Sequence, residues 1–421
     1  MLSFEKTFEP QYFQSFHCSV GNCLDSCCTG WDIAIDKETY VAYQNCQEPL
    51  LKPLFQENLV INDKSVANST YVPYALVKTN QYICPFLTSR KLCIIQKTLD
   101  ETALSMTCAT YPRTFNVVNG VLERSLNLSC PEAARLALLN EDPMQFESYE
   151  FVVGVRNPEV PLLNTQSSAQ NKPYQYFYAI RDFIVALLQD RTYPLWQRLI
   201  ILSVFCGRLE QVIAENYETD IPCLLSYFNA KIREGEFRAA MSEAETNLEM
   251  QIQVVKVLLD HRLRVGFVSN RFLACINEFK QGLGIGEAAP DEDAVARYAE
   301  AYSKYYQPLL ERHEYILENY IVNYVFKNLF PFGPQKNSFF EPQSIYDEYI
   351  LLALHYSLIK SLLIGTAAYY QTDFGTEQAV NLIQIFAKTI EHNRPYLEQA
   401  VQFIHACNMN NTGGMNVLLK N

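Results

Sequence analysis

The sequence has few of the residue types and motifs that identify common functional classes of protein. Of its 421 residues, 2 are Trp and 6 are His, and 34 Lys and Arg face 46 Asp and Glu. The net charge of −12 lacks the basic field with which nucleic-acid binders neutralise phosphates. No GxSxG, HExxH or Walker phosphate-loop motif occurs, so common hydrolase, zinc-protease and nucleotide-hydrolase signatures are missing. We therefore do not expect nucleic acid as a partner.

The chain also lacks an uninterrupted apolar run. It begins MLSFEKTFEPQYFQSF, without the apolar stretch of a secretory signal, and we expect a cytoplasmic protein whose thiols stay reduced. The most apolar stretch, 349–370, contains His355 and Lys360. It predicts a buried helix rather than a membrane span. With 49% hydrophobic and 19% charged residues, the chain is expected to be globular, free of membrane, and larger than one core.

Cysteine, by contrast, is abundant and unevenly placed. Adjacent residues such as Cys27 and Cys28 cannot readily bond to each other, and thiolates close in sequence can converge on a soft metal with little loop-closure entropy. We expect a metal or an iron–sulfur centre, ahead of a disulfide framework or of unligated core cysteines. Eight of the 13 cysteines form the candidate set, namely Cys18, Cys23, Cys27, Cys28, Cys84, Cys93, Cys108 and Cys130.

The cysteine spacing favours an iron–sulfur cluster over zinc. Zinc ribbons use pairs of C-x2-C knuckles, and no C-x2-C occurs in this sequence. Iron–sulfur clusters accept uneven spacing, and four thiolates complete one cluster. Eight cysteines allow two such sites, or one cluster with further cysteines packed around it. Cys18, Cys23 and Cys27 are the first choice as ligands, together with one or more later cysteines, and zinc is the alternative.

Five segments resemble the cysteine domain of the flagellin lysine-N-methylase (FliB-type) family, within the wider group of CxxCxxCC (YkgJ-like) zinc- or iron-chelating domains. They are FHCSVGNCLDSCCTGWDIAIDKETYVAY, CPFL, LCIIQ, TCATYPRTFN and LNLSCPEAARLAL. The resemblance covers residues 4–140 specifically and extends more loosely to the C-terminus. It implies a bacterial protein-lysine N-methyltransferase acting on surface lysines of a flagellin-like protein. It also implies S-adenosylmethionine as methyl donor and a 4Fe-4S cluster on the motif cysteines.

One departure leaves the chemistry of methyl transfer open. The usual radical S-adenosylmethionine signature is C-x3-C-x2-C on an α/β barrel, and neither this spacing nor the strand–helix alternation of a barrel occurs here. Transfer is therefore either cluster-dependent on another scaffold, which we favour, or a polar displacement beside a structural cluster. The alternatives from other classes are a zinc- or iron-chelating binding module without methylase activity and a scaffold protein. The long helical region exceeds what a chelator needs.

The pattern along the chain predicts a mostly α protein with two domains. Residues 1–150 hold the cysteines among turn-forming residues, and we expect a loop-rich, metal-cluster domain there. Residues 157–173 carry three prolines and indicate a linker, and a loop or lid is expected at 331–344. Over 174–421 apolar residues recur at helical spacing. This spacing predicts an α-helical domain, packed on the first with a ligand cleft near the cluster.

Three smaller motifs complete the candidate set, and no catalytic residue is predicted. Arg113 follows shortly after Cys108 and is the candidate for holding the carboxylate of the cofactor by paired hydrogen bonds, with a structural salt bridge as the alternative. His17 is a further candidate cluster ligand. The glycines at 282, 284 and 286 follow a predicted helix rather than a strand. They therefore predict a helix-capping loop, not a nucleotide-binding loop.

Overall fold

The structure is a computed structural model of the chain. It describes residues 2–19, 23–62, 74–155, 162–165, 172–242, 245–286, 292–333 and 344–421. It is 62% helical, which confirms the predicted mostly α class. Most of the linker predicted at 157–173, and the greater part of the loop predicted at 331–344, lie outside the described residues.

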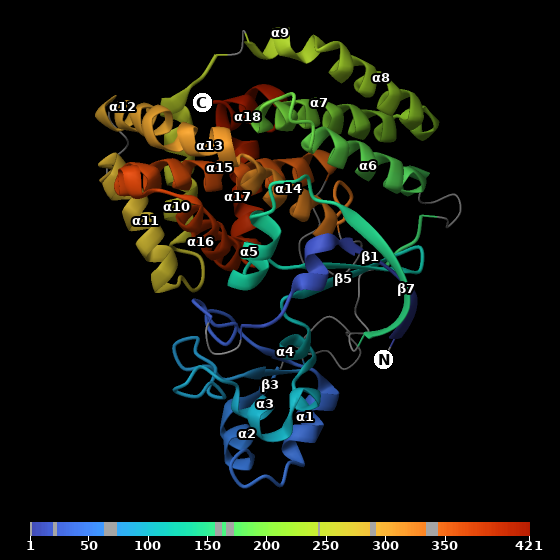
Figure 1. Cartoon of the computed structure of the whole chain (residues 1–421), viewed down its shortest axis with the longest axis vertical. Coiled ribbons are helices and arrows are strands. Elements are labelled where there is room, and N and C mark those ends of the chain that lie inside the picture. The colour runs from blue at the N-terminus through green and yellow to red at the C-terminus, as the bar shows by residue number, and fades with distance from the viewer. Residues whose placement is uncertain are drawn as a thin grey trace. The chain divides into compact units, whose positions relative to one another are not determined.

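Two compact units share the chain, and their sequences are interleaved. The first unit contains Met1–Leu136 and Phe146–Pro161, and the second contains Ala137–Gln145 and Leu162–Asn421. The chain therefore enters the second unit, returns to the first for one strand, and leaves again (Figure 1).

The first unit contains strands as well as the expected irregular segments. In its larger sheet the neighbouring strands are, in order, β7 (Phe146–Val155), β1 (Leu2–Pro10), β6 (Val121–Leu126) and β5 (Arg113–Val118); in its smaller sheet they are β2 (Ala34–Ile35), β4 (Ala75–Val77) and β3 (Leu59–Ile61). Its helices are η1 (Gln11–Ser15), α1 (Lys37–Gln44), α2 (Lys52–Asn58), α3 (Ile94–Leu99), η3 (Glu101–Ala103), α4 (Met106–Thr110) and α5 (Pro131–Leu138). Strand β1 pairs antiparallel with the long β7 and parallel with β6.

A tight hairpin joins β5 to β6. Asn119 and Gly120 connect the strands with φ angles of 51° and 82°, and the flanking Val118 and Val121 pair with each other. Two successive positive φ angles define the type I′ turn, whose twist matches that of antiparallel strands and which favours Asn-Gly. This turn chemistry explains why the strand-forming sequence on either side folds back on itself.

Around the smaller sheet lies a compact aromatic core. Tyr43 of α1 and Phe55 of α2 stack with their ring centroids 4.1 Å apart, and both are buried. Asp36 caps α1 by accepting from the Thr39 amide at 2.8 Å, and it also accepts from the Met106 amide of α4 at 2.9 Å. One carboxylate thus fixes the starts of two helices, and these hydrogen bonds hold the pKa of Asp36 below its usual range although burial opposes them.

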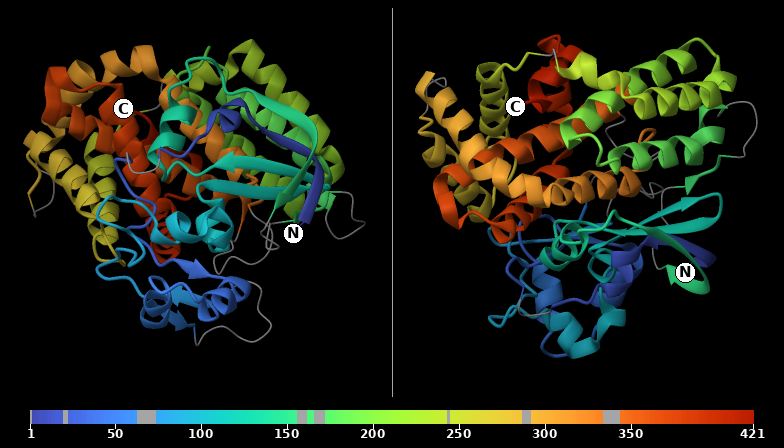
Figure 2. Two further views of the ribbon diagram at one scale, coloured as in Figure 1. Left: turned by 60° about the horizontal axis from the view of Figure 1, so that its bottom comes forward. Right: turned by 45° about the horizontal axis from the view of Figure 1, so that its top comes forward.

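The second unit is built almost wholly from helices (Figure 2). Its elements are β8 (Leu162–Leu163), η4 (Lys172–Tyr176), α6 (Phe177–Leu188), α7 (Leu195–Ala214), η5 (Glu218–Asp220), α8 (Ile221–Glu234), α9 (Glu236–Ser242), α10 (Leu248–Arg262), α11 (Asn270–Leu283), α12 (Glu292–Ala301), η6 (Tyr302–Tyr306), α13 (Gln307–His313), α14 (Tyr315–Lys327), α15 (Ile345–Tyr370), η7 (Gln371–Asp373), α16 (Thr376–Phe386), η8 (Ala387–Glu391), α17 (Arg394–Ala406) and α18 (Thr412–Leu419). The turns η6 and η8 are π-helical. The described residues from 172 onward contain no strand, as the helical prediction required.

Helix α15 is the central helix of this unit. Ser344 caps it by accepting from the Asp347 amide at 3.1 Å, and α7, α11, α14 and α18 are among the helices that contact it. In the described part of the chain it is the one helix long and apolar enough to cross a membrane, but its apolar window is 100% buried inside the protein. The prediction of a buried helix over 349–370 is therefore confirmed.

Two glycines allow α11 to cross α15 closely. A Cβ on Gly282 would collide with the carbonyl oxygen of Gly365, and a Cβ on Gly365 would collide with the ring of Phe279. The next glycine, Gly284, ends α11 in the left-handed conformation with φ 60°. The glycine-rich segment is thus a close crossing followed by a helix cap, as the predicted capping loop requires.

Candidate functional site

The eight candidate cysteines all lie in the first unit, on irregular segments and near the ends of short elements. Cys18, Cys23 and the pair Cys27 and Cys28 lie between η1 and β2, Cys84 and Cys93 precede α3, Cys108 lies in α4, and Cys130 directly precedes α5. The Cys84 amide donates to the Cys28 carbonyl oxygen at 2.9 Å. This bond joins two of the cysteine-bearing segments directly.

Cys28, Cys84, Cys93 and Cys108 form a first thiol group, with Cys27 at its edge. A hydrogen bond from Cys27 lowers the pKa of Cys28. A hydrogen bond with Cys84, burial, and repulsion from the neighbouring Cys84 and Cys93 thiolates act in the opposite direction. Together they raise the pKa of Cys28 to about 12. Although residue Cys108 is exposed, its thiol is enclosed, and desolvation together with Cys93 and Cys27 raises its pKa to about 11. These thiols therefore face one another and raise one another's pKa values.

A second thiol group contains Cys18, Cys23 and Cys130. Burial raises the pKa of Cys130 to about 11, against the opposing hydrogen bonds from the Ala133 and Glu132 amides, and Cys23 and Cys18 raise it further. Burial also raises the pKa of Cys23, and Cys18 and Cys27 add to this effect. Cys27 influences members of both groups, so the eight cysteines form two adjoining sets.

The donor chemistry of these groups suits a soft metal or an iron–sulfur cluster, because a cation offsets the repulsion between neighbouring thiolates. Their arrangement is not a closed coordination shell: within the described ranges, no three His, Cys, Asp or Glu side chains are placed to hold a metal ion. Cys46, a further cysteine of this unit, instead packs against the aromatic core. The ligand set and the cofactor therefore remain predictions.

Arg113 and His17 lie at exposed positions. The Arg113 guanidinium carbon lies 5.3 Å from the centroid of the Phe16 ring, and Arg113 begins β5 directly after the Tyr111–Pro112 peptide bond, which is cis. The described residues supply no ion pair for Arg113. His17 Nδ1 lies 3.1 Å from the Ser15 carbonyl oxygen. The role of each in binding a cofactor or cluster stays a prediction.

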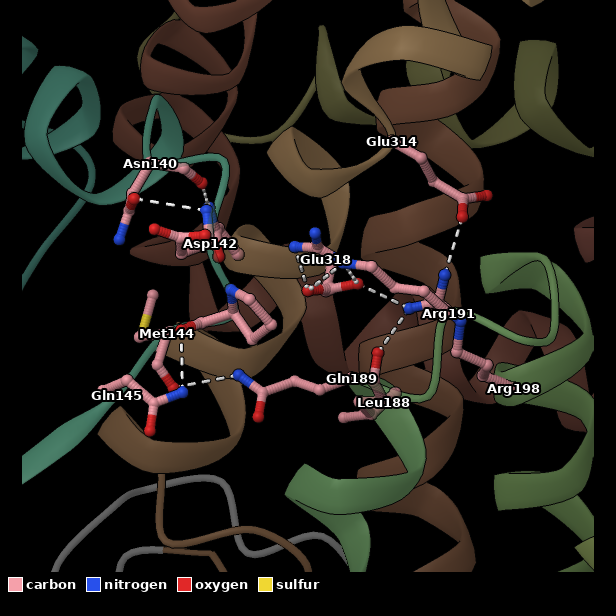
Figure 3. Close-up of polar contacts among 12 residues, drawn as sticks. Asn140, Asp142, Met144, Gln145, Leu188, Gln189, Arg191, Arg198, Glu314 and Glu318 are labelled. Carbon is pink, nitrogen blue, oxygen red and sulfur yellow. Dashed lines mark hydrogen bonds and ion pairs between the residues drawn. The ribbon is translucent and has the colours of Figure 1, made fainter. Parts of the chain in front are cut away.

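The second unit contains a buried network of arginines and glutamates (Figure 3). Arg198 of α7, 1% exposed, donates to Glu318 at 2.6 Å and to Glu314 at 2.7 Å. Two further N–H groups donate to the Leu188 and Tyr193 carbonyl oxygens at 2.6 and 2.7 Å. Because Leu188 ends α6, the guanidinium also neutralises the carbonyl end of that helix.

Arg191 completes this network from the surface side. It forms a forked pair with Glu318, with Nη2 to Oε1 at 2.9 Å and Nε to Oε2 at 3.1 Å. Glu318 is thus shared between a buried and an exposed arginine. Burial raises the pKa of Glu314, although Arg198 opposes the shift. The Arg198 guanidinium uses four of its five N–H donors on these acceptors, so the network holds the helices together.

The segment Ala137–Gln145 is attached next to this network. The Asn319 side-chain amide donates to the Asn140 carbonyl oxygen at 2.8 Å, and the Gln189 side chain donates to the Met144 carbonyl oxygen at 2.9 Å. Figure 3 shows this segment beside the arginine network. Helices α6 and α14 therefore satisfy the backbone of a segment that comes directly before strand β7.

A second buried polar cluster joins α14, α15 and the π-turn η8. The Tyr320 hydroxyl donates to Glu391 at 2.7 Å and lies 3.3 Å from His355 Nδ1, while Lys327 pairs with the other Glu391 oxygen at 2.5 Å. Since the Tyr320 hydrogen goes to Glu391, its oxygen accepts from His355 Nδ1, which leaves Nε2 as the unprotonated nitrogen. π-Turns of this kind recur at functional positions.

His355 is held neutral in this cluster. Burial lowers its pKa to about 4, although Glu391 raises it, and its Nε2 is buried with no hydrogen-bond partner among the described residues. Accepting a proton there would place a second positive charge beside Lys327. His355 of α15 is therefore a buried base of low basicity, oriented by the Tyr320 hydroxyl of α14.

Sequence reasoning missed both buried polar clusters of the helical unit. The signal available for the first was a single Arg, Arg198, inside the apolar run LWQRLIILSVF, because an isolated charge on a buried helix needs a partner. Glu314 and Glu318 lie more than a hundred residues further on, so their pairing with Arg198 could not be predicted. The predicted ligand cleft between the domains stays a prediction.

Comparison with known proteins relates the whole chain to lysine methylases. A family model described as the FliB lysine N-methylase C-terminal domain matches residues 181–418. Two proteins named Lysine-N-methylase, from Salmonella typhimurium (strain LT2) and Salmonella choleraesuis (strain SC-B67), are each 23% identical over 404 residues, which cover 91% of this chain and 92% of theirs. No solved structure matches the chain.

Another relative is more similar over a shorter stretch. The Flagellar biosynthetic protein FliU of Salmonella muenchen is 33% identical over 136 residues, which cover 32% of this chain and 79% of that protein. The resemblance to the FliB-type family is thereby confirmed, whereas the resemblance to the wider group of chelating domains stays a prediction. With more than half of its residues matched, the chain belongs to the family of the FliB lysine N-methylase C-terminal domain.

Proposed function

We propose that this chain is a protein-lysine N-methyltransferase that uses S-adenosylmethionine and acts on surface lysines of a flagellin-like protein. The observation that carries the proposal is the similarity along 91% of the chain to two proteins named Lysine-N-methylase. The name of the FliU relative supports a flagellar substrate. The net charge of −12 also favours encounter with a lysine-rich protein surface.

We further propose that the cysteines of the first unit hold a 4Fe-4S cluster, with zinc as the alternative metal. Cys18, Cys23, Cys27 and Cys28 together with Cys84, Cys93, Cys108 and Cys130 are the proposed donors. When bound, such a cluster supplies electrons for cleaving the methyl donor or serves only to crosslink the unit. The mutual rise of the thiol pKa values supports this assignment, because thiols arranged in this way gain from a cation.

In this reaction the residues of the chain must keep the amine of the substrate lysine neutral and must bind the methyl donor. A lysine amine, with an ordinary pKa near about 10.4, must be neutral to accept a methyl group, so a polar transfer needs a dry pocket or a nearby base. Arg113, which is exposed and lies against the Phe16 ring, is proposed to bind the carboxylate of the donor by two parallel hydrogen bonds.

Product analysis tests the function and separates the two chemistries. Anaerobically prepared protein is incubated with methyl-labelled S-adenosylmethionine and flagellin, with and without dithionite. We expect label on lysine. S-adenosylhomocysteine formed in step with methyl-lysine identifies polar transfer, whereas 5′-deoxyadenosine that depends on dithionite identifies the cluster-dependent reaction that we favour.

Matched variants make this test specific. Cys28→Ser should abolish the cluster-dependent reaction, whereas Cys46→Ser, which changes a thiol packed on the core of the same unit, should leave it unchanged. Arg113→Lys should raise KM for S-adenosylmethionine with little change in kcat. An absence of label transfer to several acceptors, by protein with its full metal content, would replace the methylase with the zinc- or iron-chelating binding module.

A further inference from the structure

A small polar pocket lies among α11, α15 and α16 of the helical unit. Its volume is about 130 Å³, which is enough for a small organic molecule, and its polar lining comprises Arg271, Cys275, Glu278, Thr366, Gln378 and Asn381. Apolar side chains, among them Leu382 and Ile385, form part of its wall. None of these residues belongs to the cysteine groups or to the two buried clusters described above.

The close crossing of α11 and α15 explains why the pocket forms here. Because Gly282 and Gly365 let the two backbones meet, the preceding two turns of α11 run directly alongside α15. Arg271 and Glu278 are seven residues apart, which is about two helical turns, so they project from the same face of α11. Thr366 follows Gly365 and therefore lies opposite that face. The glycine pair thus brings an arginine, a glutamate and a hydroxyl to one cavity.

One group in the pocket lacks a hydrogen-bond partner in the described structure. The Thr366 hydroxyl is buried, with the residue 2% exposed, and it makes no hydrogen bond, not even to its own helix. Burying a hydroxyl in this way costs free energy, and native proteins rarely leave such a group unsatisfied without a water or ligand. Thr366 lines the pocket, but its hydroxyl oxygen is fully buried, so a bound molecule would reach that oxygen only after the Thr366 side chain rotates to another rotamer.

The charged and polar groups divide the pocket into a donor side and an acceptor side. Arg271 donates to the Gln384 side-chain oxygen at 2.9 Å and to the Asn381 side-chain oxygen, which leaves the Asn381 NH₂ group as a donor. Gln378 uses its oxygen to accept from the Gly375 amide at 3.1 Å, which leaves its NH₂ group as a second donor. These groups suit a carboxylate.

The acceptor side lies at the other end of the same α11 face. Glu278 accepts from the Tyr370 hydroxyl at 3.1 Å and keeps its other oxygen available, and the Thr366 hydroxyl adds a second acceptor. Burial raises the pKa of Cys275 to about 12, so its thiol stays neutral. The lining thus carries one positive and one negative side chain, which complements a ligand with both charges.

We propose that this pocket binds the head group of an α-amino acid, with its carboxylate at Arg271, Gln378 and Asn381 and its ammonium group at Glu278 and Thr366. A free amino acid and the amino-acid end of S-adenosylmethionine present the same chemistry. The inference concerns binding alone and does not depend on the methylase proposal. If the methylase proposal holds and the pocket binds the methyl donor by its methionine end, the donor carboxylate lies at Arg271 and not at Arg113, so the two assignments are alternatives.

Isothermal titration calorimetry on the full chain tests this assignment. The ligands are methionine, lysine, S-adenosylmethionine and S-adenosylhomocysteine, with acetate and methylamine as probes that carry one charge each. We expect the ligands that carry both an ammonium group and a carboxylate to bind at least tenfold more tightly than acetate or methylamine. Equal affinity for methionine and S-adenosylmethionine identifies a free amino acid as the ligand, whereas tighter binding of S-adenosylmethionine identifies the methyl donor.

Two substitutions separate ligand binding from fold. Thr366→Val should weaken binding about tenfold and leave the melting temperature equal or higher, because it removes an unsatisfied buried hydroxyl. Glu278→Gln should weaken the binding of amino acids more than that of acetate. The matched controls are Ser303→Ala and Glu249→Gln, which change an exposed hydroxyl and an exposed carboxylate elsewhere in the unit and should leave binding unchanged.

The possible outcomes are distinguishable from those of the methylase test. Absence of binding by every ligand that carries both charged groups, or binding that neither substitution weakens, overturns the pocket assignment even where methyl transfer is intact. Binding with the expected losses, in protein that transfers no methyl group, supports the pocket and counts only against the methylase proposal.

Discussion

In the first unit the candidate cysteines bring thiols face to face, whereas the two buried clusters of the helical unit pair Arg198 and Lys327 with carboxylates. Cys28 and its neighbours raise one another's pKa values, while Arg198 and Glu318 lie 2.6 Å apart and neutralise each other. An added cation stabilises a group of thiolates that repel one another. A group of paired opposite charges needs no added cation for its stability. The comparison suggests that the first unit depends on a bound metal and that the second does not.

The two tryptophans of the chain allow each unit to be followed separately. Trp31 lies in the first unit, where its indole donates to the Cys27 carbonyl oxygen at 2.6 Å, and Trp196 lies in α7 of the helical unit. The chain has no other Trp. Fluorescence of Trp196→Phe protein therefore reports unfolding of the first unit, and fluorescence of Trp31→Phe protein reports unfolding of the second.

The largest effect is expected from the cysteines. Alanine at Cys18, Cys23 or Cys27 should remove most of the bound iron and sulfide and should lower the unfolding midpoint seen by Trp31, because metal binding contributes directly to folding of this unit. Iron and sulfide analysis of anaerobic protein measures the first effect. Cys46→Ala is the control and should retain the metal. A full cluster in all three variants would contradict the ligand assignment.

Arg198→Met should destabilise the helical unit by about 3–5 kcal/mol, because it leaves Glu318 and two backbone carbonyl groups short of a donor. Urea unfolding followed by Trp196 measures the loss, and the Trp31 transition should not move. The control is Glu300→Ala, which breaks an exposed pair with Lys304 and should cost less than about 1 kcal/mol. Equal effects of the two substitutions would rule out a stabilising role for the buried network.

Glu348 should make the helical unit less stable as the pH rises. Burial, with a contribution from Asp347, raises its pKa from 4.5 to about 8. The folded state thus binds more protons than the unfolded state between pH 4.5 and 8, so the free energy of unfolding falls across this window. Glu348→Gln should remove this slope and gain about 4 kcal/mol at pH 8. Unfolding titrations at pH 5 and pH 8 compare the two proteins, and parallel pH profiles would refute the assignment.

The smallest effect concerns the hairpin of the first unit. Gly120→Ala should destabilise it by about 1 kcal/mol, because the φ of 82° is unfavourable for a residue with a Cβ, although nothing lies within 4 Å of the new atom. Gly286→Ala is the matched control, since that glycine has equal space and no positive φ. The shift should be visible to Trp31 and not to Trp196. No difference between the two substitutions would show that the turn conformation is not maintained in solution.

The parts of the fold that could be predicted from sequence are those controlled by local patterns. The apolar run at 349–370 predicted the buried helix α15, and the glycines after residue 281 predicted a helix end. The Asn119-Gly120 pair between two Val-rich segments was an equally local signal for a hairpin. The strands of the first unit were not predicted, because the interpretation of residues 1–150 relied on the cysteines and the turn-forming residues.

Contacts between distant residues were beyond such reasoning. The pairing of Arg198 with Glu318 spans 120 residues, and the burial of Thr366 beside Glu278 depends on how two helices cross. The sequence did predict that the eight cysteines belong together, and the structure brings them into two adjoining groups. It could not predict which thiols are neighbours, because that depends on how the segments that carry them pack.

The interleaved order of the two units has a consequence for synthesis of the protein. Strand β1 is translated well before its antiparallel partner β7, which begins only at Phe146 and ends at Val155. Before translating β7, the ribosome must deliver Ala137–Gln145, whose helical partners are made later still. The nascent chain therefore cannot complete its first unit early, and its exposed strand edge makes it a natural client of ribosome-associated chaperones.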